Sequence, residues 1–212
     1  MENRTMKIMS RNSNVPLKIA QGHFVTSHSH INYYMDMTTL KARQSEAELA
    51  AQALAPVYSN ETVVDTILCM DGTQIIGAFL AKELTRAGFM SINAHQTIYV
   101  VTPENDTNGQ MIFRDNIQPM IRGKHVLVLT DSVTTGITVR KSEECIRYYG
   151  GSVSGVAAIF SAVDQVQGIP VKAIFGPEDV PGYATYSSHD CVLCKQGQKI
   201  DAMVNSYGYT KF

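Results

Sequence analysis

The sequence predicts an α/β fold, a doubly wound parallel sheet flanked by helices. Apolar runs rich in β-branched residues alternate along the chain with segments of helical periodicity. The run Val-Leu-Val-Leu at 126–129 is short and fully apolar, as expected for a strand that helices cover on both faces of a parallel sheet. Strands and helices that alternate in this way fold into a parallel sheet between two helical layers.

The N-terminal part of the chain is expected to form short strands and then a helix. Residues 21–39 mix aromatic and polar side chains, which favours short strands joined by a turn. Ser45 and Glu48 have the spacing of a capping box and mark the expected start of the helix. Pro56 marks its approximate end, because proline removes a helical hydrogen bond.

Glycines mark the ends of two later helices, and apolar runs mark the remaining strands. One helix is expected over 75–87 with Gly88 as its C-terminal cap, and another over 138–149 that ends before two glycines. The expected strands cover 63–70, 97–101, 126–129, 153–163 and 171–175.

The composition excludes several classes of protein. The chain has 212 residues with 18 Lys and Arg against 19 Asp and Glu, so it lacks the cationic excess of a nucleic-acid-binding surface. No apolar run reaches the roughly 20 residues of a membrane-spanning helix, and the polar N-terminus has no signal-peptide core. Four cysteines are too few for a disulfide scaffold. We therefore expect a cytoplasmic protein that binds neither nucleic acid nor membrane.

The segment 126–138 carries the most informative chemistry. An apolar strand leads into Asp131, then into a turn rich in Thr and Gly, and then into the start of a helix. In an open α/β sheet, ligands bind beyond the carboxyl ends of the strands. The turn offers N–H groups and hydroxyls beside the positive end of a helix dipole, which suits a phosphate, while Asp131 suits ribose hydroxyls or the water shell of Mg²⁺. The alternative, a polar helix cap, explains Thr138 but not the whole run.

This run resembles the signature with which type I phosphoribosyltransferases bind 5-phosphoribosyl 1-diphosphate (PRPP). In that signature an apolar strand leads to two acidic residues, two small residues and a Thr-Thr/Ala-Gly-x-Thr turn. Other segments resemble the orotate phosphoribosyltransferase branch, and together the matches extend over roughly 22–195. They are the hood segments 22–24 and 33–36, the pyrophosphate-loop region 65–77, the strand-end motif 163–165 and the Cys-x-x-Cys sequence 191–194.

The resemblance implies a type I phosphoribosyltransferase fold over a single domain, 1–212. It implies a small N-terminal hood at 1–40. The residues themselves predict a mobile lid loop at 102–122, since this polar connection is long, and a Gly/Tyr/Ser-rich tail at 177–212 that packs over the sheet edge or a partner subunit. The resemblance also implies transfer of ribose 5-phosphate from PRPP to a nucleobase with release of pyrophosphate, Mg²⁺ as cofactor, and a homodimer. Since the transition state of this reaction is oxocarbenium-like, the protein is expected mainly to position the reactants and neutralise the diphosphate.

The resemblance further implies roles for individual residues. Asp131 is the implied catalytic residue and the one that holds Mg²⁺ through water, and Tyr34 and Gln165 are implied at the base. Asp71, Gly72 and Thr73 belong to the implied pyrophosphate loop, although the residues alone equally allow a plain turn there. The implied PRPP-binding residues are Thr130, Asp131, Ser132, Val133, Thr134, Thr135, Gly136, Ile137 and Thr138.

Two departures from the family pattern concern the diphosphate and the ribose. Thr130 stands where the signature has its first acidic residue, so one carboxylate of the signature is missing. The lid segment 101–109 holds two carboxylates and no cation, and Arg114 is the only basic residue before Arg122. An acidic lid beside a leaving diphosphate raises the barrier, because like charges repel most strongly where water is excluded. These features favour an alternative function, a PRPP or nucleotide sensor that has lost turnover.

Two further departures concern the base and the hood. Gln165 stands where the orotate branch has an Arg that pairs with the orotate carboxylate, and an amide cannot neutralise that charge. The hood loop 26–30 lacks the usual glycine and basic residue, but it offers His28 and His30 as candidate contacts. We therefore expect orotate to be a poor substrate.

The cysteines raise the question of a second metal. His189, Cys191 and Cys194 offer three candidate zinc ligands, whereas a structural zinc site needs four and no second pair lies nearby in the sequence. We therefore expect Cys191 and Cys194 to hold no stoichiometric metal. Cys69 and Cys145 fall in an expected strand and helix, where a cysteine is usually a small buried apolar residue.

Overall fold

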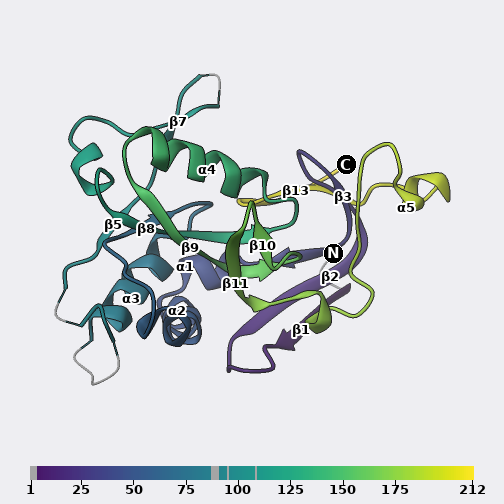
Figure 1. The fold of residues 1–212 in the computed structure, drawn as a ribbon. Coiled ribbons are helices and arrows are strands. Elements are labelled where there is room, and N and C mark those ends of the chain that lie inside the picture. Colours follow the sequence, from purple (N-terminus) through teal and green to yellow (C-terminus); the bar gives the residue numbers. More distant parts are fainter. Residues whose placement is uncertain (1–3, 87–90, 95, 108) are drawn as a thin grey trace.

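The larger part of the molecule is built on a six-stranded sheet with the order β10-β11-β9-β8-β4-β5 (Figure 1). The computed structural model describes residues 4–86, 91–94, 96–107 and 109–212. All neighbouring strands of this sheet pair in parallel except β10, which is antiparallel to β11. The strands are β4 (Thr66–Cys69), β5 (Tyr99–Val101), β8 (His125–Val133), β9 (Ser152–Ser161), β10 (Gln165–Val166) and β11 (Ile169–Phe175).

Helices cover both faces of this sheet, which confirms the predicted doubly wound α/β fold. Helices α2 (Gln44–Ser59) and α3 (Gln74–Thr85) lie on one face and α4 (Ile137–Tyr148) on the other (Figure 1). Leu127 and Leu129 of β8 belong to the apolar cluster of α2 and α3, whereas Val126 and Val128 belong to the cluster of α4. Because successive side chains of a strand point to opposite faces, a strand between two helical layers must be apolar at every position.

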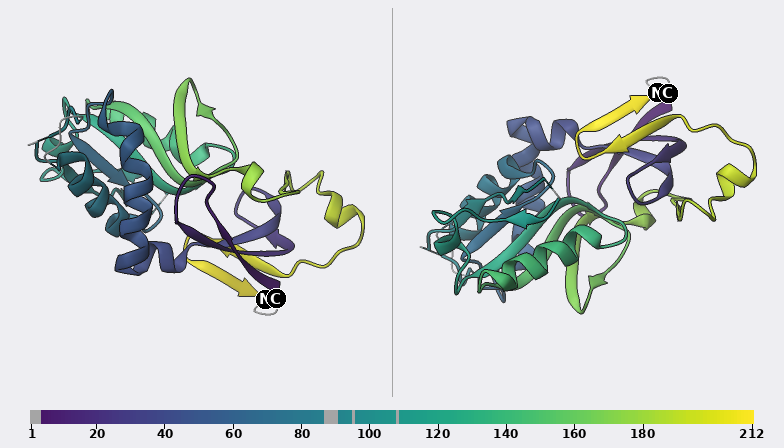
Figure 2. Two further views of the ribbon diagram at one scale, coloured as in Figure 1. Left: turned by 90° about the horizontal axis from the view of Figure 1, so that it is seen from below. Right: turned by 90° about the horizontal axis from the view of Figure 1, so that it is seen from above.

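The hood is a second six-stranded sheet with the order β12-β3-β2-β13-β14, and β1 pairs with β2. Figure 2 shows this sheet beside the α/β part, with strands from both ends of the chain. Ala20, Phe24 and Tyr34 from the N-terminal part and Ala202 and Val204 from the tail share a small apolar core. The strands are β1 (Thr5–Met9), β2 (Pro16–Val25), β3 (His30–Asp36), β12 (Thr185–Tyr186), β13 (Ala202–Asn205) and β14 (Gly208–Lys211).

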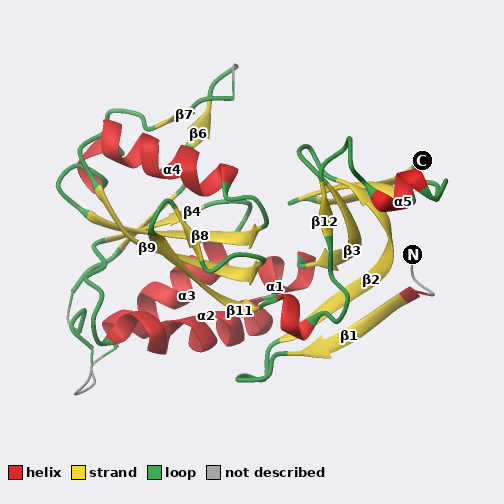
Figure 3. Cartoon of the chain, turned by 45° about the vertical axis from the view of Figure 1, so that its right-hand side comes forward, coloured by secondary structure: helices red, strands yellow, loops and turns green. Residues whose placement is uncertain are grey.

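Short elements connect and extend these two sheets. Helix α1 (Thr38–Ala42) joins the hood to the α/β part, and the strands β6 (Glu104–Asn105) and β7 (Met111–Ile112) form a hairpin within the expected lid. Figure 3 shows that this hairpin projects next to α4. The remaining short elements are α5 (Val192–Lys195) and the 3-10 turns Gln118–Met120 and Pro177–Asp179. None of the described helices is both long and apolar enough to cross a membrane.

Local end signals of the helices were less reliable than the strand pattern. Helix α2 begins at Gln44, and Arg43 before it makes no capping hydrogen bond through its side chain. The Glu48 side chain accepts from the Gln44 side-chain amide at 3.0 Å. The predicted capping box of Ser45 and Glu48 is therefore wrong. Since α1 ends just before, Ser45 already lies inside the first turn. Pro56 lies inside α2 rather than at its end. The expected cap Gly88 lies outside the described residues.

Helix α2 continues past Pro56 because its last turns are buried against the sheet. Proline removes one N–H donor, and this loss is offset where the following residues pack into the core. Tyr58 is only 3% exposed, and its hydroxyl donates to the Val156 carbonyl of β9 at 2.8 Å.

We expect Tyr58→Phe to lower the free energy of unfolding by about 1 kcal/mol, because the buried carbonyl of Val156 loses a donor. Urea denaturation measures this change, and the slope of the transition should stay the same. Tyr148→Phe is the matched control, since Tyr148 is 83% exposed. Equal stability of the two variants would contradict the assignment.

Candidate functional site

A cleft lies where the carboxyl ends of β4 and β8 meet the hood. Most of its lining comes from the turn after β4, from the end of β8 with the start of α4, and from strands and loops of the hood. Its lining includes Asp71, Asp131, Ser132, Val133, Thr134, Thr135, Gly136, Ile137, Thr138, Thr26, Ser27, His28, Tyr34, Tyr183, Asn205 and Ser206. The structure therefore gathers most of the predicted PRPP-binding residues in one place, at the sheet edge where α/β proteins bind ligands.

The turn between β8 and α4 presents its backbone to the cleft. Gly136 is the residue that precedes α4 and has φ +74, a left-handed conformation that glycine adopts without strain. A Cβ atom there would lie 2.6 Å from Val166 Cγ2, so a larger residue would also clash. The first N–H groups of a helix have no acceptor within the helix. Together with the hydroxyls of Thr134, Thr135 and Thr138, they make a binding place suited to a phosphate.

Asp131 is held by a lysine that the sequence analysis missed. Lys41 of α1 donates to Asp131 Oδ2 at 2.8 Å and to the carbonyl oxygen of Asp71 at 2.8 Å, and it also donates to the carbonyl oxygen of Ser206. The side chains of Lys41 and Asp131 are 10% and 8% exposed. Helix α1 has five residues and no apolar periodicity, so no local signal marked Lys41 as part of a site.

Thr130 holds a second carboxylate. Its side chain is fully buried in β8 and donates to Asp71 Oδ2 at 2.8 Å. Asp71 follows β4, has φ +54 and lines the cleft. The residue that replaces the first acid of the signature thus positions a carboxylate from the neighbouring strand end, and the cleft has two carboxylates despite the substitution.

Burial and charge set the protonation of the cleft residues. Burial raises the pKa of Asp131 to about 6, and the negative charge of Asp71 acts in the same direction, whereas Lys41 and the Ser132 hydroxyl oppose the shift. Burial, followed by the charge of Asp36, raises the pKa of Tyr34 to about 12. At neutral pH the cleft therefore combines ionised Asp131 with a Tyr34 hydroxyl that remains a donor.

Several residues predicted for the site do not face the cleft. The Thr73 hydroxyl is buried and donates to the carbonyls of Met70 and Leu129, so it closes the turn after β4. Gly72 has φ +82 and forms the same turn. For Gly72 and Thr73 the structure therefore agrees with the alternative, a plain structural turn. Gln165 lies exposed on β10 and is not among the residues that line the cleft.

The described part of the lid also stays away from the cleft. None of the described residues of 102–122 lines it. Arg114, which follows β7, forms an ion pair with Glu104 of β6 at 2.8 Å, so this arginine is paired within the lid itself. His28 of the hood loop lines the cleft, whereas His30 is buried in the hood.

Comparison with known proteins identifies the family. No protein-family model matches the chain. The chain is 31% identical over 184 residues to orotate phosphoribosyltransferase of Pelotomaculum thermopropionicum, covering 83% of this chain and 85% of that protein. It is 27% identical over 186 residues to orotate phosphoribosyltransferase of Thermus thermophilus, covering 86% of this chain and 92% of that protein. The chain belongs to the orotate phosphoribosyltransferase family.

Solved structures agree with this assignment at the level of the fold. The orotate phosphoribosyltransferase structure from Aeropyrum pernix has a TM-score of 0.54 and 18% identity, covering 84% of this chain and 92% of that chain. The predicted resemblance to type I phosphoribosyltransferases is therefore confirmed, and the chain is a member of a family of PRPP-dependent enzymes. Within this family, the pairing of Thr130 with Asp71 places a carboxylate in the cleft from outside the PRPP signature.

The expectation that Cys191 and Cys194 hold no stoichiometric metal rested on the lack of a second ligand pair near them in the sequence, with His189 as the third candidate ligand. In the structure His189 is exposed and outside the group, while His23 and His30 lie beside the two cysteines. The second pair was missed because it lies in the hood strands, more than 150 residues earlier in the chain.

We expect the carboxyl group of Asp131 to titrate with a pKa near 6 in the unchanged protein. In the Lys41→Met variant the pKa of Asp131 should be higher, because Lys41 is the main group that favours the ionised form. Carbon-13 NMR of protein labelled at the aspartate carboxyl carbons measures both values, with Asp131→Asn to assign the signal. Lys82→Met is the control, since Lys82 pairs with Glu48 on the surface of the helices. A midpoint near the ordinary value of about 3.9 in the unchanged protein would contradict this account.

Proposed function

We propose that the cleft binds PRPP with Mg²⁺ and transfers ribose 5-phosphate to a nucleobase, releasing pyrophosphate. The observation that carries the proposal is the arrangement at the ends of β4 and β8. There a helix N-terminus rich in hydroxyls lies next to two carboxylates, Asp71 and Asp131. A phosphorylated sugar has the complementary chemistry, since its phosphate needs donors and its hydroxyls need acceptors.

The turn at 134–138 is the place for the 5′-phosphate in this proposal. Among the described residues that line the cleft there is no Lys or Arg, so N–H groups, hydroxyls and the dipole of α4 supply the positive field. Asp131 accepts from the ribose hydroxyls. Lys41 occupies one oxygen of Asp131 and the Ser132 hydroxyl donates to the other at 3.2 Å, which fixes the orientation of the carboxylate before the substrate arrives.

The donor set of the cleft fits Mg²⁺ bound through its water shell. Mg²⁺ prefers oxygen ligands and usually keeps several waters beside one or two carboxylates and substrate phosphates. Asp71 and Asp131 supply such carboxylates, and the bond from Lys41 to Asp131 favours an indirect contact. The ion supplies charge neutralisation of the diphosphate.

The two carboxylates also suit the charge of the reaction. As the bond from ribose to diphosphate breaks, positive charge develops on the sugar. Ionised Asp131 and Asp71, held by Lys41 and Thr130, favour that charge without reorganisation in a site where water does not screen them fully. Asp131 is therefore the catalytic residue of this proposal, and Lys41 is a positioning residue.

A homodimer completes the proposal. No described lid residue lines the cleft of its own chain, and the hairpin β6–β7 projects beside α4 instead. A lid that reaches the cleft of a second copy supplies cover that its own chain lacks. The lid brings no net positive charge there, because 102–122 holds three carboxylates and two arginines, and Arg114 pairs with Glu104.

Orotate should be a poor substrate within this proposal. Its carboxylate needs a cation, yet Gln165 lies outside the cleft and Lys41 is already engaged with three oxygen atoms. A hydrogen bond to a charged group is worth about 1.5–3 kcal/mol, so we expect kcat/KM for orotate to be roughly 10- to 100-fold below that for an uncharged base.

Steady-state assays with PRPP, Mg²⁺ and a panel of charged and uncharged bases, followed by pyrophosphate detection, test both the activity and the base preference. Asp131→Asn is the inactive control. Efficient turnover of orotate, with a rate in the usual range of roughly 1–10³ per second, would contradict the base preference. If the protein binds PRPP but none of the bases in the panel leads to release of pyrophosphate, the transferase activity is contradicted.

We expect Thr130→Val to raise KM for PRPP roughly tenfold, because Asp71 loses the hydroxyl that holds it in the cleft. Valine has nearly the same shape as threonine, so the buried position in β8 stays filled. Thr85→Val is the matched control, since the Thr85 hydroxyl bonds only within α3, to the Ala81 and Lys82 carbonyls. An unchanged KM in Thr130→Val would show that Asp71 has no part in binding.

A further inference from the structure

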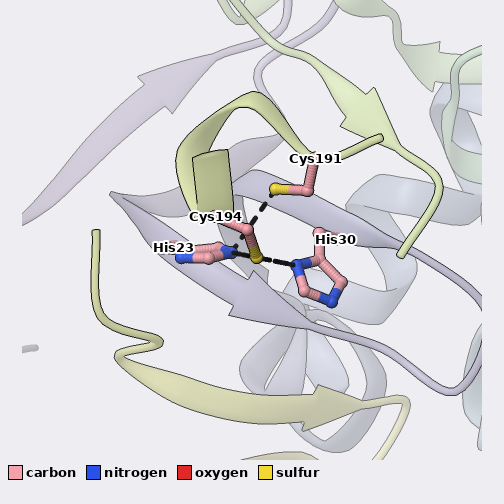
Figure 4. Close-up of side chains that lie close together, drawn as sticks. All are labelled: His23, His30, Cys191 and Cys194. Atoms are coloured by element: carbon pink, nitrogen blue, oxygen red, sulfur yellow. Dashed lines mark hydrogen bonds between the residues drawn. The ribbon is translucent and has the colours of Figure 1, made fainter. Parts of the chain in front are cut away.

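Two histidines of the hood and two cysteines of the tail point at one another (Figure 4). His23 lies on β2 and His30 on β3. Cys191 directly precedes α5, and Cys194 lies within it. One ligand atom from each residue lies within 4.8 Å of all the others. None of these four residues lines the substrate cleft.

The three nitrogen-to-sulfur distances within the group match the edges of a tetrahedral metal site, and the nitrogen-to-nitrogen distance is shorter than such an edge. His23 Nε2 lies 3.0 Å from His30 Nδ1, 3.5 Å from Cys191 Sγ and 3.6 Å from Cys194 Sγ. Cys194 Sγ lies 3.4 Å from His30 Nδ1. Bonds of about 2.0–2.1 Å to nitrogen and 2.3 Å to sulfur, arranged tetrahedrally around zinc, place ligand atoms about 3.3–3.8 Å apart.

Hydrogen bonds alone do not account for this arrangement. His23 Nδ1 lies 2.9 Å from the Gln198 carbonyl oxygen, which can only accept, so this nitrogen carries the proton and donates. The Nε2 atom then has one lone pair, yet three polar atoms crowd around it. One lone pair cannot serve three donors, whereas a cation at the centre satisfies all four atoms at once. The bond to Gln198 is also the type of outer contact that orients a metal-bound histidine.

The surrounding segment of the tail is held by little burial of its own. Between Val180 and Ala202, Cys191 is the only residue that is buried. A segment of this length without an apolar core cannot hold a fixed conformation by burial, and small units of this kind are commonly stabilised by metal or disulfide. All four cysteines of the chain are free thiols.

We propose that His23, His30, Cys191 and Cys194 form a structural zinc site that fastens the C-terminal tail to the hood. Zinc favours tetrahedral sites of two thiolates and two imidazoles, and closed sites of this composition are structural. The two thiols release their protons when zinc binds, and the two thiolates then balance the charge of the buried ion. Cys194 is exposed, which gives the metal a route into the site.

The zinc site also supports the substrate cleft from a distance. The segment that contains α5 leads directly into β13, which pairs with β2, and then to Ser206, whose carbonyl accepts from Lys41. Loss of the metal releases α5 from the hood and loosens the segment that precedes this contact. The site therefore acts on the architecture of the cleft and takes no part in the reaction.

Metal analysis of the whole chain tests the proposal independently of any enzymatic activity. We expect protein made in zinc-supplemented medium and purified under reducing conditions without chelator to contain one zinc ion per chain by elemental analysis. Replacement by Co²⁺ should give the visible absorption of a tetrahedral cobalt ion together with a thiolate-to-cobalt charge-transfer band. Cys194→Ser should lose most of the metal, whereas His189→Ala and Cys145→Ser, which leave the four ligands in place, should keep it.

Three outcomes would overturn the assignment. They are a zinc content below about a tenth of an equivalent in the unchanged protein, iron in place of zinc, and full zinc retention in a Cys191→Ser/Cys194→Ser variant. Because the first two outcomes and the cobalt spectrum are measured on the unchanged protein, the test does not depend on the folding of a variant. Hydrogen exchange gives a further measure, since chelation should raise exchange in 181–201 and leave α2 and α3 unchanged.

Discussion

The ion pair between Lys41 and Asp131 is the interaction on which the cleft depends. A buried ion pair is stable only when the cost of removing both charges from water is offset by further hydrogen bonds. The ammonium group of Lys41 has three donors, and three oxygen atoms from β8, the turn after β4 and the tail accept them. One lysine on α1 thereby fixes three segments that are far apart in the sequence. Without it, Asp131 would be a buried carboxylate with no ion-pair partner among the described residues, and the tail would lose the hydrogen bond from Lys41 to Ser206.

In the proposed function, the charges of the cleft favour one orientation of a phosphorylated sugar. The N-terminus of α4 supplies a positive field at one end, and Asp71 and Asp131 supply negative charge beside it. Asp71 is held by a hydrogen bond from Thr130, so the cleft keeps two carboxylates although the sequence signature has lost one. The second carboxylate comes from a residue that follows the neighbouring strand β4. Charge placement, rather than the exact signature, is what the chemistry requires.

The hood owes its structure to both ends of the chain. Its sheet pairs N-terminal strands with strands of the tail, and its small core needs Ala202 and Val204 as much as Phe24 and Tyr34. A sheet with so small a core is marginal by itself, because little apolar area is buried. The cluster of His23, His30, Cys191 and Cys194 lies where the tail leaves this sheet and has no core of its own. The zinc ion that we propose at that point would stabilise the hood where packing does not.

The sequence by itself determined the α/β sheet and the position of the Thr- and Gly-rich turn that lines the cleft. Both follow from local patterns: a strand between two helical layers must be apolar throughout, as at 126–129, and a Thr- and Gly-rich turn before a helix is recognisable from adjacent residues. The local signals at Ser45 and Pro56 misled, since the neighbouring helix α1 and the burial of Tyr58 override them.

Only the tertiary structure decided which distant side chains meet. Lys41 reaches Asp131 across 90 positions, Thr130 reaches Asp71 across 59, and His23 reaches Cys191 across 168. Such contacts leave no periodic trace, because one charged or polar residue at a strand end or in a short helix has the same local sequence whether it is solvated or paired. The order of the strands in the two sheets sets these distances, and that order results from packing over the whole chain rather than from any segment of it.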